Sequence, residues 1–277
     1  MRTLLLTFAL LLSAHVVHAQ TSSAAQHLGF DRNLYPGDSA LPALRKYFAF
    51  TGYWLNNPPG ETTNTWRNKR DTLARNTFGF LVLFNGREDA QILRFKRRGT
   101  SPEALGKQDA AASIVAAQRE HFPAGTIIFL DQEEGGRLLE EQSTYLFAWT
   151  EAIAASTYKP GVYLSGQPAD DGPGKTITTA RHVQQLVDEK HLHTVALFVY
   201  QDTCPPSNGC TITPPSIASS GTPDIIAWQY AQSPRRPENT AACRKTYAAD
   251  NNCYAPGVPK IYLDMNVAIS DDPSHGR

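Results

Sequence analysis

The sequence predicts an α/β protein of the (β/α)₈ TIM-barrel type, and three observations support this. Eight short apolar segments alternate with helical stretches along the chain. Runs such as 80–84 and 127–130 are apolar at odd and even positions alike, so both faces of each strand are apolar. This is typical of parallel strands buried on both faces. Eight strands with intervening helices, in the 258 residues that follow the first 19 of the 277, favour such a barrel over an open doubly wound sheet.

The expected strands mostly end at a polar residue and lie at 27–33, 51–56, 78–85, 126–133, 161–165, 194–201, 224–230 and 260–267. The expected helices lie between them at 39–50, 64–76, 101–121, 138–156 and 178–190. Ser101-Pro102-Glu103 starts one of these with a cap, a proline at the first position and an early acid. After the sixth and seventh strands the helices are missing or short. No repeat or linker interrupts the pattern, so residues 20–277 are predicted to form a single barrel domain.

Residues 1–19 have the pattern of a secretory signal peptide. Arg2 supplies a positive end, 4–12 is a largely apolar run, and Val17-His18-Ala19 offers a cleavage site before Gln20. The apolar run is shorter than the roughly 20 residues that span a bilayer, and no second run of that length follows. The sequence therefore predicts a secreted or periplasmic protein with no integral membrane association.

The four cysteines fit an oxidising compartment. Their spacing does not resemble a paired CxxC zinc site, so disulfides are expected and a metal is not. Four cysteines allow three connectivities. Pairing of neighbours, Cys204 with Cys210 and Cys243 with Cys253, is the simplest, and it would staple the loops that replace the two missing helices.

The charge balance excludes one class of partner. The chain has 26 basic and 26 acidic side chains, and a protein that holds nucleic acid by its overall field needs a basic excess. The only dense basic cluster, 94–98, is expected to be a solvated loop. No nucleic-acid partner is predicted.

Polar residues recur at the expected strand ends, where the βα loops of a barrel meet. They are Asp31, Asn56, Asn85, Asp131, Glu133, Ser165, Gln201, Gln229, Asp264 and Asn266. Asp131 and Glu133 are two apart, so both carboxylates would project from the same strand face. Such a pair can keep one group protonated as a general acid while the other stays anionic, as glycosidic cleavage requires. The alternative is that these acids, with Glu134, only cap the following helix.

Aromatic residues fall near the same strand ends and favour a sugar ligand. They are Tyr53, Trp54, Tyr163, Tyr200, Trp228 and Tyr230. Apolar faces of ligands pack on aromatic walls while polar groups fix their orientation. Each aromatic taken singly is more often part of the core, so the cluster is the signal.

Five motifs taken together resemble glycoside hydrolase family 25. They are Gly29-Phe30-Asp31, 129–133 (FLDQE), 159–165 (KPGVYLS), Trp228-Gln229-Tyr230 and 263–267 (LDMNV). These enzymes are lysozymes of the N-acetylmuramidase type. Segments 51–56 and 81–85 depart from that family, and the chain is more similar to the related glycoside hydrolase-like barrel of uncharacterised exported bacterial proteins. The resemblance implies Glu133 as proton donor, Asp131 as its partner carboxylate, and Asp31 and Asp264 as supporting acids.

Other motifs carry less weight. Residues 169–176 lack the first glycine of a phosphate-binding loop, His191 and His193 have no third ligand in view, and Ser165 has no visible triad. No cofactor is expected.

The sequence predicts a lysozyme-like, retaining or substrate-assisted glycosidase for N-acetylated cell-wall polysaccharide, or a descendant of one. Substrate binding is assigned to Asp31, Tyr53, Asn85, Tyr163, Gln201, Trp228, Gln229, Tyr230, Asp264 and Asn266. The alternative is a non-catalytic glycan-binding barrel.

Overall fold

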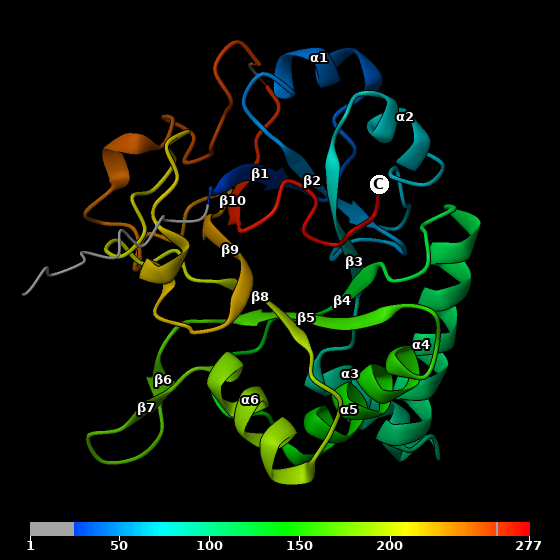
Figure 1. Cartoon of the computed structure of the whole chain (residues 1–277). Helices are drawn as coiled ribbons and strands as arrows, with labels where there is room; N and C mark the ends of the chain where they lie inside the picture. Colours follow the sequence, from blue (N-terminus) through cyan, green and yellow to red (C-terminus); the bar gives the residue numbers. More distant parts are fainter. Residues whose placement is uncertain (1–24, 259) are drawn as a thin grey trace, which may run out of the picture.

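A computed structural model describes residues 25–258 and 260–277 (Figure 1). The predicted signal peptide, 1–19, lies outside the described residues. The strands are β1 His27–Asp31, β2 Phe50–Trp54, β3 Gly79–Asn85, β4 Ile127–Gln132, β5 Lys159–Ser165, β6 Ala169–Asp170, β7 Thr176–Ile177, β8 Ala196–Tyr200, β9 Ile225–Ala231 and β10 Asp264–Ala268. The α-helices are α1 Leu41–Leu44, α2 Arg70–Arg75, α3 Asp89–Arg97, α4 Pro102–Arg119, α5 Glu140–Ala154 and α6 Thr179–Lys190.

Eight strands close into a barrel in the order β1-β10-β9-β8-β5-β4-β3-β2, which confirms the predicted fold class. The strands from β1 through β5 to β9 pair in parallel, and β6 and β7 form a separate two-stranded ribbon. Short 3₁₀ turns, η2 Ile217–Ser220 and η3 Arg244–Thr246, are the helical elements that follow β8 and β9. The helices after the sixth and seventh barrel strands are therefore reduced, as predicted.

The last strand differs from the expected all-parallel arrangement. β10 runs antiparallel to both of its neighbours, β9 and β1. A parallel neighbour needs a long crossover, usually a helix, to carry the chain back to the other end of the sheet. In the described part of the 232–263 connection the one helical element is the short η3, so the chain enters β10 from the end of the barrel at which β9 finishes.

Two helical predictions need correction. The helices expected at 39–50 and 64–76 shrink to η1 Asp38–Ala40 with α1, and to α2. The expected loop at 94–98 instead forms the end of α3, with Arg94, Lys96 and Arg97 in its last turn. These cations remain exposed, and positive charge at a helix C-terminus is favourable to the helix dipole.

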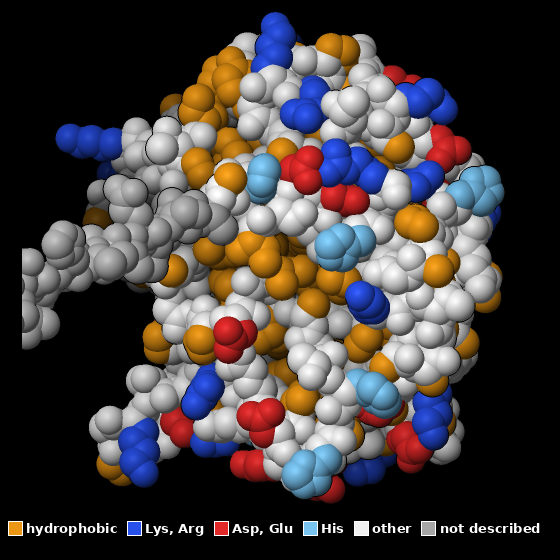
Figure 2. Space-filling view, viewed as in Figure 1, with side chains coloured by type: hydrophobic (Ala, Val, Ile, Leu, Met, Phe, Trp, Pro, Cys, Tyr) orange, Lys and Arg blue, Asp and Glu red, His pale blue; other side chains and the backbone are white. Residues whose placement is uncertain are grey.

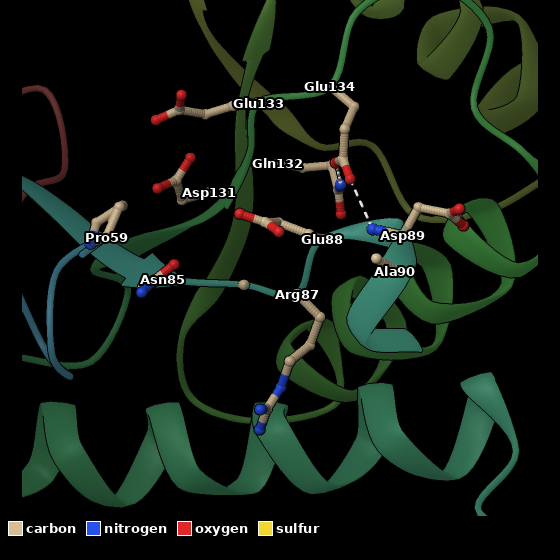
Figure 3. A pocket seen from close by; sticks show the side chains of 11 residues that line it. Pro59, Asn85, Arg87, Glu88, Asp89, Ala90, Asp131, Gln132, Glu133 and Glu134 are labelled. Carbon is tan, nitrogen blue, oxygen red and sulfur yellow. Dashed lines mark hydrogen bonds between the residues drawn. The ribbon is translucent and has the colours of Figure 1, made fainter. Parts of the chain in front are cut away.

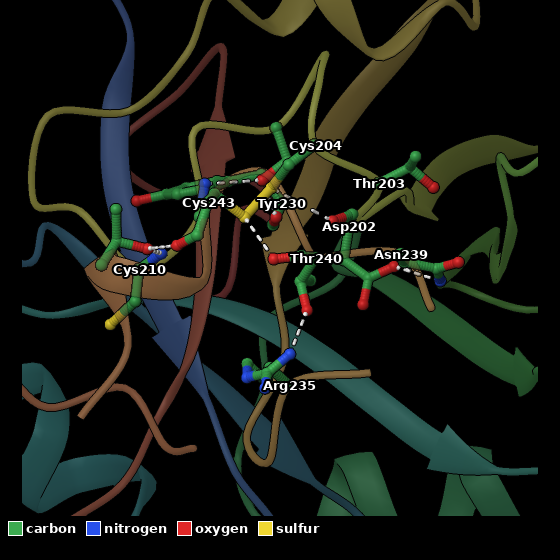
Figure 4. The surroundings of a disulfide bond; sticks show 12 residues. Asp202, Thr203, Cys204, Cys210, Tyr230, Arg235, Asn239, Thr240 and Cys243 are labelled. Atoms are coloured by element: carbon green, nitrogen blue, oxygen red, sulfur yellow. Dashed lines mark hydrogen bonds between the residues drawn. A yellow bond between two sulfur atoms is a disulfide. The ribbon is translucent and has the colours of Figure 1, made fainter. Parts of the chain in front are cut away.

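The predicted disulfide pairing is wrong. Cys204 is bonded to Cys243, with their Cα atoms 5.9 Å apart (Figure 4). Cys210 and Cys253 lie outside that bond. The loops after β8 and β9 lie side by side, and the Cys204 amide donates to the carbonyl of Asn239 over 2.9 Å. Proximity between the two loops, which sequence spacing does not reveal, sets the pairing.

Helices α4 and α5 pack closely against one side of the barrel (Figure 1). Ser101 caps α4 by accepting from the Ala104 amide, and Pro102 follows at the first turn, as expected. Gly106 permits the close contact, because a Cβ there would lie 2.3 Å from the Tyr145 carbonyl oxygen of α5.

The C-terminal residues extend the barrel wall between β3 and β4. Ser274 accepts from the Val82 amide through Oγ and from the Ile127 amide through its carbonyl, and Asp272 accepts from the Phe80 amide. Within the described residues, no helix is long and apolar enough to cross a bilayer. Positive and negative side chains are interspersed on the face drawn in Figure 2.

Candidate active site

Four acids from separate parts of the chain meet at the mouth of the barrel: Asp31, Asp131, Glu133 and Asp264, here called the four-acid cluster. Asp31 ends β1 and Asp264 begins β10, and the two are register partners. Asp131 lies near the end of β4, in register with Asn85 of β3 and Tyr163 of β5. The antiparallel direction of β10 places its first residue, rather than its last, at the mouth.

Asp31 is held by a buried hydrogen-bond network. Its Oδ2 accepts from Gln229 Nε2 over 2.9 Å and from Asn266 Nδ2 over 2.8 Å. Gln229 Oε1 in turn accepts from the Tyr163 hydroxyl over 2.7 Å. Gly52 leaves room for this carboxylate, because a Cβ there would lie 2.5 Å from the Asp31 Cβ. Burial raises the pKa of Asp31, and the hydrogen bonds from Asn266 and Gln229 oppose that rise.

Asp131 is buried, with 5% of its surface exposed, and its Oδ1 atom has no hydrogen-bond partner. Burial raises the pKa of Asp131 well above its ordinary value, and the charges of Glu133, Asp31 and Glu134 raise it further. Burial and the charge of Asp31 likewise raise the pKa of Asp264, against a hydrogen bond from the Ser233 amide. The four-acid cluster therefore binds protons more tightly than the same carboxyl groups would in water.

Glu133 follows β4, and its side chain reaches solvent at the mouth. Its carbonyl oxygen accepts from the Tyr200 hydroxyl over 2.6 Å, which fixes the backbone at this point. Partial desolvation raises the pKa of Glu133, the charge of Asp31 adds to the rise, and the charge of Arg236 opposes it. Glu133 thus combines access to a ligand with a raised proton affinity.

A pocket of about 530 Å³ opens at this point. Asp131 and Glu133 project into the same side of it, with Glu88 facing them from the start of α3 (Figure 3). A second pocket of about 630 Å³ shares Pro59, Asn85, Gly86, Arg87 and Glu88 with the first and continues past Arg67 and Arg119. The two pockets are therefore neighbours: acids dominate the lining of the first, and Arg67 and Arg119 belong to the lining of the second.

The helix-capping interpretation is wrong for Asp131 and Glu133. Helix α5 starts at Glu140 and is capped by Leu139, whose amide donates to Gln142 Oε1 over 2.8 Å. Glu134 does have a capping role, but toward a different helix. Its Oε1 accepts from the amide of Asp89, the first residue of α3, over 2.6 Å (Figure 3).

Arg236 and Asp202 are site residues that sequence reasoning missed. The fully buried Asp202 carboxylate accepts two hydrogen bonds from the Arg236 guanidinium, whose carbon lies 5.1 Å from the centre of the Tyr200 ring. Arg236 lies in the connection between β9 and β10 and Asp202 just after β8. Neither belongs to a motif, and only the contact of the two loops brings them together.

Three predicted substrate-binding aromatics are excluded from the mouth. Tyr53 is fully buried beneath α4, where its hydroxyl donates to Glu120 Oε2 over 2.5 Å. Trp228 and Tyr230 flank Gln229 on β9, so they point to the opposite face of the strand. Both are fully buried and donate to loop carbonyls, those of Gln201 and Thr211.

The other predicted residues lie at or near the cluster. Tyr163, Gln229 and Asn266 belong to the Asp31 network, and Asn85 lines both pockets. Gln201 has a local role, because its Oε1 accepts from the Thr203 amide. Among the residues that the structure describes, no group of three or more His, Cys, Asp or Glu side chains has the arrangement of a metal site.

Known structures share this fold. An uncharacterized B. stearothermophilus protein is 17% identical, with a TM-score of 0.57 over 88% of this chain and 98% of that one. The Mycobacterium tuberculosis Tat-secreted protein Rv2525c, in complex with HEPES, is 11% identical, with a TM-score of 0.53 over 92% of this chain and 98% of that one. No curated protein matches the chain.

The family match covers the central strands of the barrel. Residues 47–197 match the Rv2525c-like, glycoside hydrolase-like domain. That segment includes Asp131 and Glu133, whereas Asp31 and Asp264 lie on either side of it. The chain therefore belongs to the Rv2525c-like glycoside hydrolase-like family.

Proposed function

We propose that this protein is an exported glycoside hydrolase that cleaves N-acetylated cell-wall polysaccharide. The observation that carries the proposal is the pair Asp131 and Glu133, two carboxyl groups of raised pKa that project into one pocket. Glycosidic cleavage requires one proton donor and one anion in a shared site.

Glu133 acts as the general acid. Its exposed side chain can reach the oxygen of the leaving sugar, and its raised pKa keeps a proton available nearer to neutral pH. Proton transfer to that oxygen breaks the glycosidic bond and leaves Glu133 as an anion. The same residue then accepts a proton from the attacking water in the second half of the reaction.

Asp131 stabilises the positive charge that develops at the sugar, or orients an N-acetyl group of the substrate as the nucleophile. Mutual repulsion makes simultaneous ionisation of Asp131 and Glu133 unfavourable, so the pair tends to hold one proton between them. Asp31 and Asp264 surround the pair, Asn85 lines the pocket and contacts the substrate, and Tyr163, Gln229 and Asn266 hold the Asp31 carboxylate in position.

Export is the second part of the proposal. Residues 1–19 have the pattern of a signal peptide, and the Cys204–Cys243 disulfide fits an oxidising compartment. The similar M. tuberculosis protein Rv2525c is Tat-secreted.

The decisive experiment is release of reducing ends from purified peptidoglycan and from chitin oligomers. Glu133→Gln keeps the shape of the side chain and removes the titrating proton, so turnover should fall by about 10² to 10⁴. Glu140→Gln is the matched control, because Glu140 is exposed on α5 and lines neither pocket. It should retain full activity.

Two outcomes contradict the assignment. If the wild type hydrolyses glycan and Glu133→Gln does so at the same rate, Glu133 is not the acid. If the wild type binds glycan in a titration but never cleaves it, the protein is a glycan-binding barrel, and Asp131 and Glu133 contribute only to binding.

A further inference from the structure

We propose that Cys210 and Cys253 form a second disulfide, which crosses the Cys204–Cys243 bond in sequence order and ties the same two loops together. The two thiols lie close enough to interact, since a hydrogen bond with the other thiol shifts the pKa of each. They come from different loops, Cys210 from the β8–β9 connection and Cys253 from the β9–β10 connection.

The surrounding backbone holds the two cysteines in place. The Cys210 amide donates to Thr246 Oγ1 over 2.9 Å. The amide of Tyr254, next to Cys253 in the chain, lowers the pKa of the Cys210 thiol. The Cys210 sulfur points away from the Cys204–Cys243 bond (Figure 4). Since Cys204 and Cys243 are already paired, Cys253 is the partner that remains for Cys210.

The environments of the two thiols indicate which cysteine reacts first when the disulfide forms. Cys210 is half-buried, and the hydrogen bond from Cys253 lowers the pKa of its thiol, whereas burial raises the pKa of Cys253. The Cys210 thiolate attacks a sulfur of an external disulfide, such as oxidised glutathione, and releases one thiolate. Cys253 then loses its proton and attacks the Cys210 sulfur, which releases the second thiolate. The two cysteines lose two protons and two electrons, and the external disulfide gains two electrons.

The bond would fix the turn that supports the four-acid cluster. The Cys253 amide donates to Ser233 Oγ over 2.9 Å, and the Ser233 amide donates to Asp264 Oδ1 over 2.5 Å. Ser233 Oγ also donates to the Leu263 carbonyl, one residue before Asp264. A covalent anchor at Cys253 therefore stabilises the backbone that presents Asp264, in a connection where the described residues form only the short η3.

The test is non-reducing peptide mapping of the full chain after incubation with oxidised glutathione. We expect one linked peptide pair with Cys204 and Cys243, a second with Cys210 and Cys253, and no free thiol after denaturation. Cys210→Ser should expose one thiol, at Cys253, and the Cys210→Ser/Cys253→Ser double variant should expose none. Both should keep the Cys204–Cys243 peptide pair.

Thermal unfolding gives a second measurement. The oxidised wild type should unfold roughly 5 to 10 °C above the double variant, because the bond restricts the unfolded chain. That difference should disappear when both are compared under reducing conditions that also open Cys204–Cys243. Alkylation of both Cys210 and Cys253 in the oxidised wild type, or a link from either to Cys204 or Cys243, would overturn the proposal.

Discussion

Asp31 and Asp264 are direct register partners on the antiparallel strands β1 and β10, so their carboxylates emerge at the same end of the barrel. Burial raises the pKa of both carboxyl groups, and the charge of Asp31 raises the pKa of Asp264 further. The first and last strands thus supply two acids that flank Asp131 and Glu133 of β4. The cluster depends on closure of the barrel between the two ends of the chain.

Asp131→Asn should stabilise the protein at neutral pH. A carboxyl group whose folded pKa is raised contributes stability below the pH at which an unfolded aspartate ionises, about 3.9, and that contribution is lost as pH rises through the folded pKa. The amide removes this cost without breaking a hydrogen bond at Oδ1, which has none. Thermal unfolding should show a higher Tm than wild type at pH 7 and a smaller difference near pH 4.

Asp31→Asn is the matched comparison for that experiment. Its Oδ2 atom accepts two hydrogen bonds, so the neutral amide weakens contacts as well as removing charge. We expect a smaller gain in Tm at pH 7 than for Asp131→Asn. A lower Tm for Asp131→Asn than for wild type at pH 7 would contradict the assigned direction of the pKa.

Tyr53→Phe and Tyr163→Phe should separate structural from functional tyrosines. Loss of the Tyr53 hydroxyl removes a hydrogen bond from the buried Glu120 carboxylate and should cost about 1 to 3 kcal/mol of unfolding free energy. Ligand binding should be unchanged. Tyr163→Phe removes the hydroxyl bonded to Gln229 and should weaken glycan binding or turnover. Urea unfolding measures the loss of stability, and a glycan titration measures the loss of binding. A binding defect in Tyr53→Phe would contradict the assignment of Tyr53 to the core.

Arg236→Gln should raise the pKa of Glu133. The guanidinium charge lowers that pKa, so its removal favours the protonated acid. A general acid loses activity as it deprotonates, and the basic limb of the pH–rate profile should therefore move to higher pH. Arg236→Lys keeps the charge and should leave the limb nearer to its wild-type position. Movement of the limb to lower pH in Arg236→Gln would show that another group sets it.

Gly52→Ala should displace Asp31 and destabilise the barrel. The added Cβ would lie 2.5 Å from the Asp31 Cβ, where neither backbone can easily shift, and overpacking of this kind costs about 1 to 3 kcal/mol. Gly135→Ala is the control, because its nearest neighbour would be 3.8 Å away. Chemical denaturation should show a clear loss for Gly52→Ala alone, and equal stability of the two variants would contradict the close packing.

Local signals in the sequence determined much of the architecture. Apolar runs at both parities identified β3 and β4 as buried parallel strands, and Ser101-Pro102 located the start of α4, because both depend on neighbouring residues. The two-residue spacing of Asp131 and Glu133 likewise implied a shared direction, which the pocket displays. These features follow from the geometry of a single strand or helix.

Only the tertiary structure decided the features that join distant segments. The direction of β10, the Cys204–Cys243 pairing and the Asp202–Arg236 pair all depend on how loops of many residues cross the barrel mouth. The same holds for Tyr53, Trp228 and Tyr230, whose position near strand ends left open which face they occupied. The residues flanking Gln229 point away from the mouth because Gln229 points toward Asp31, and that register is fixed by pairing with strands far apart in the sequence.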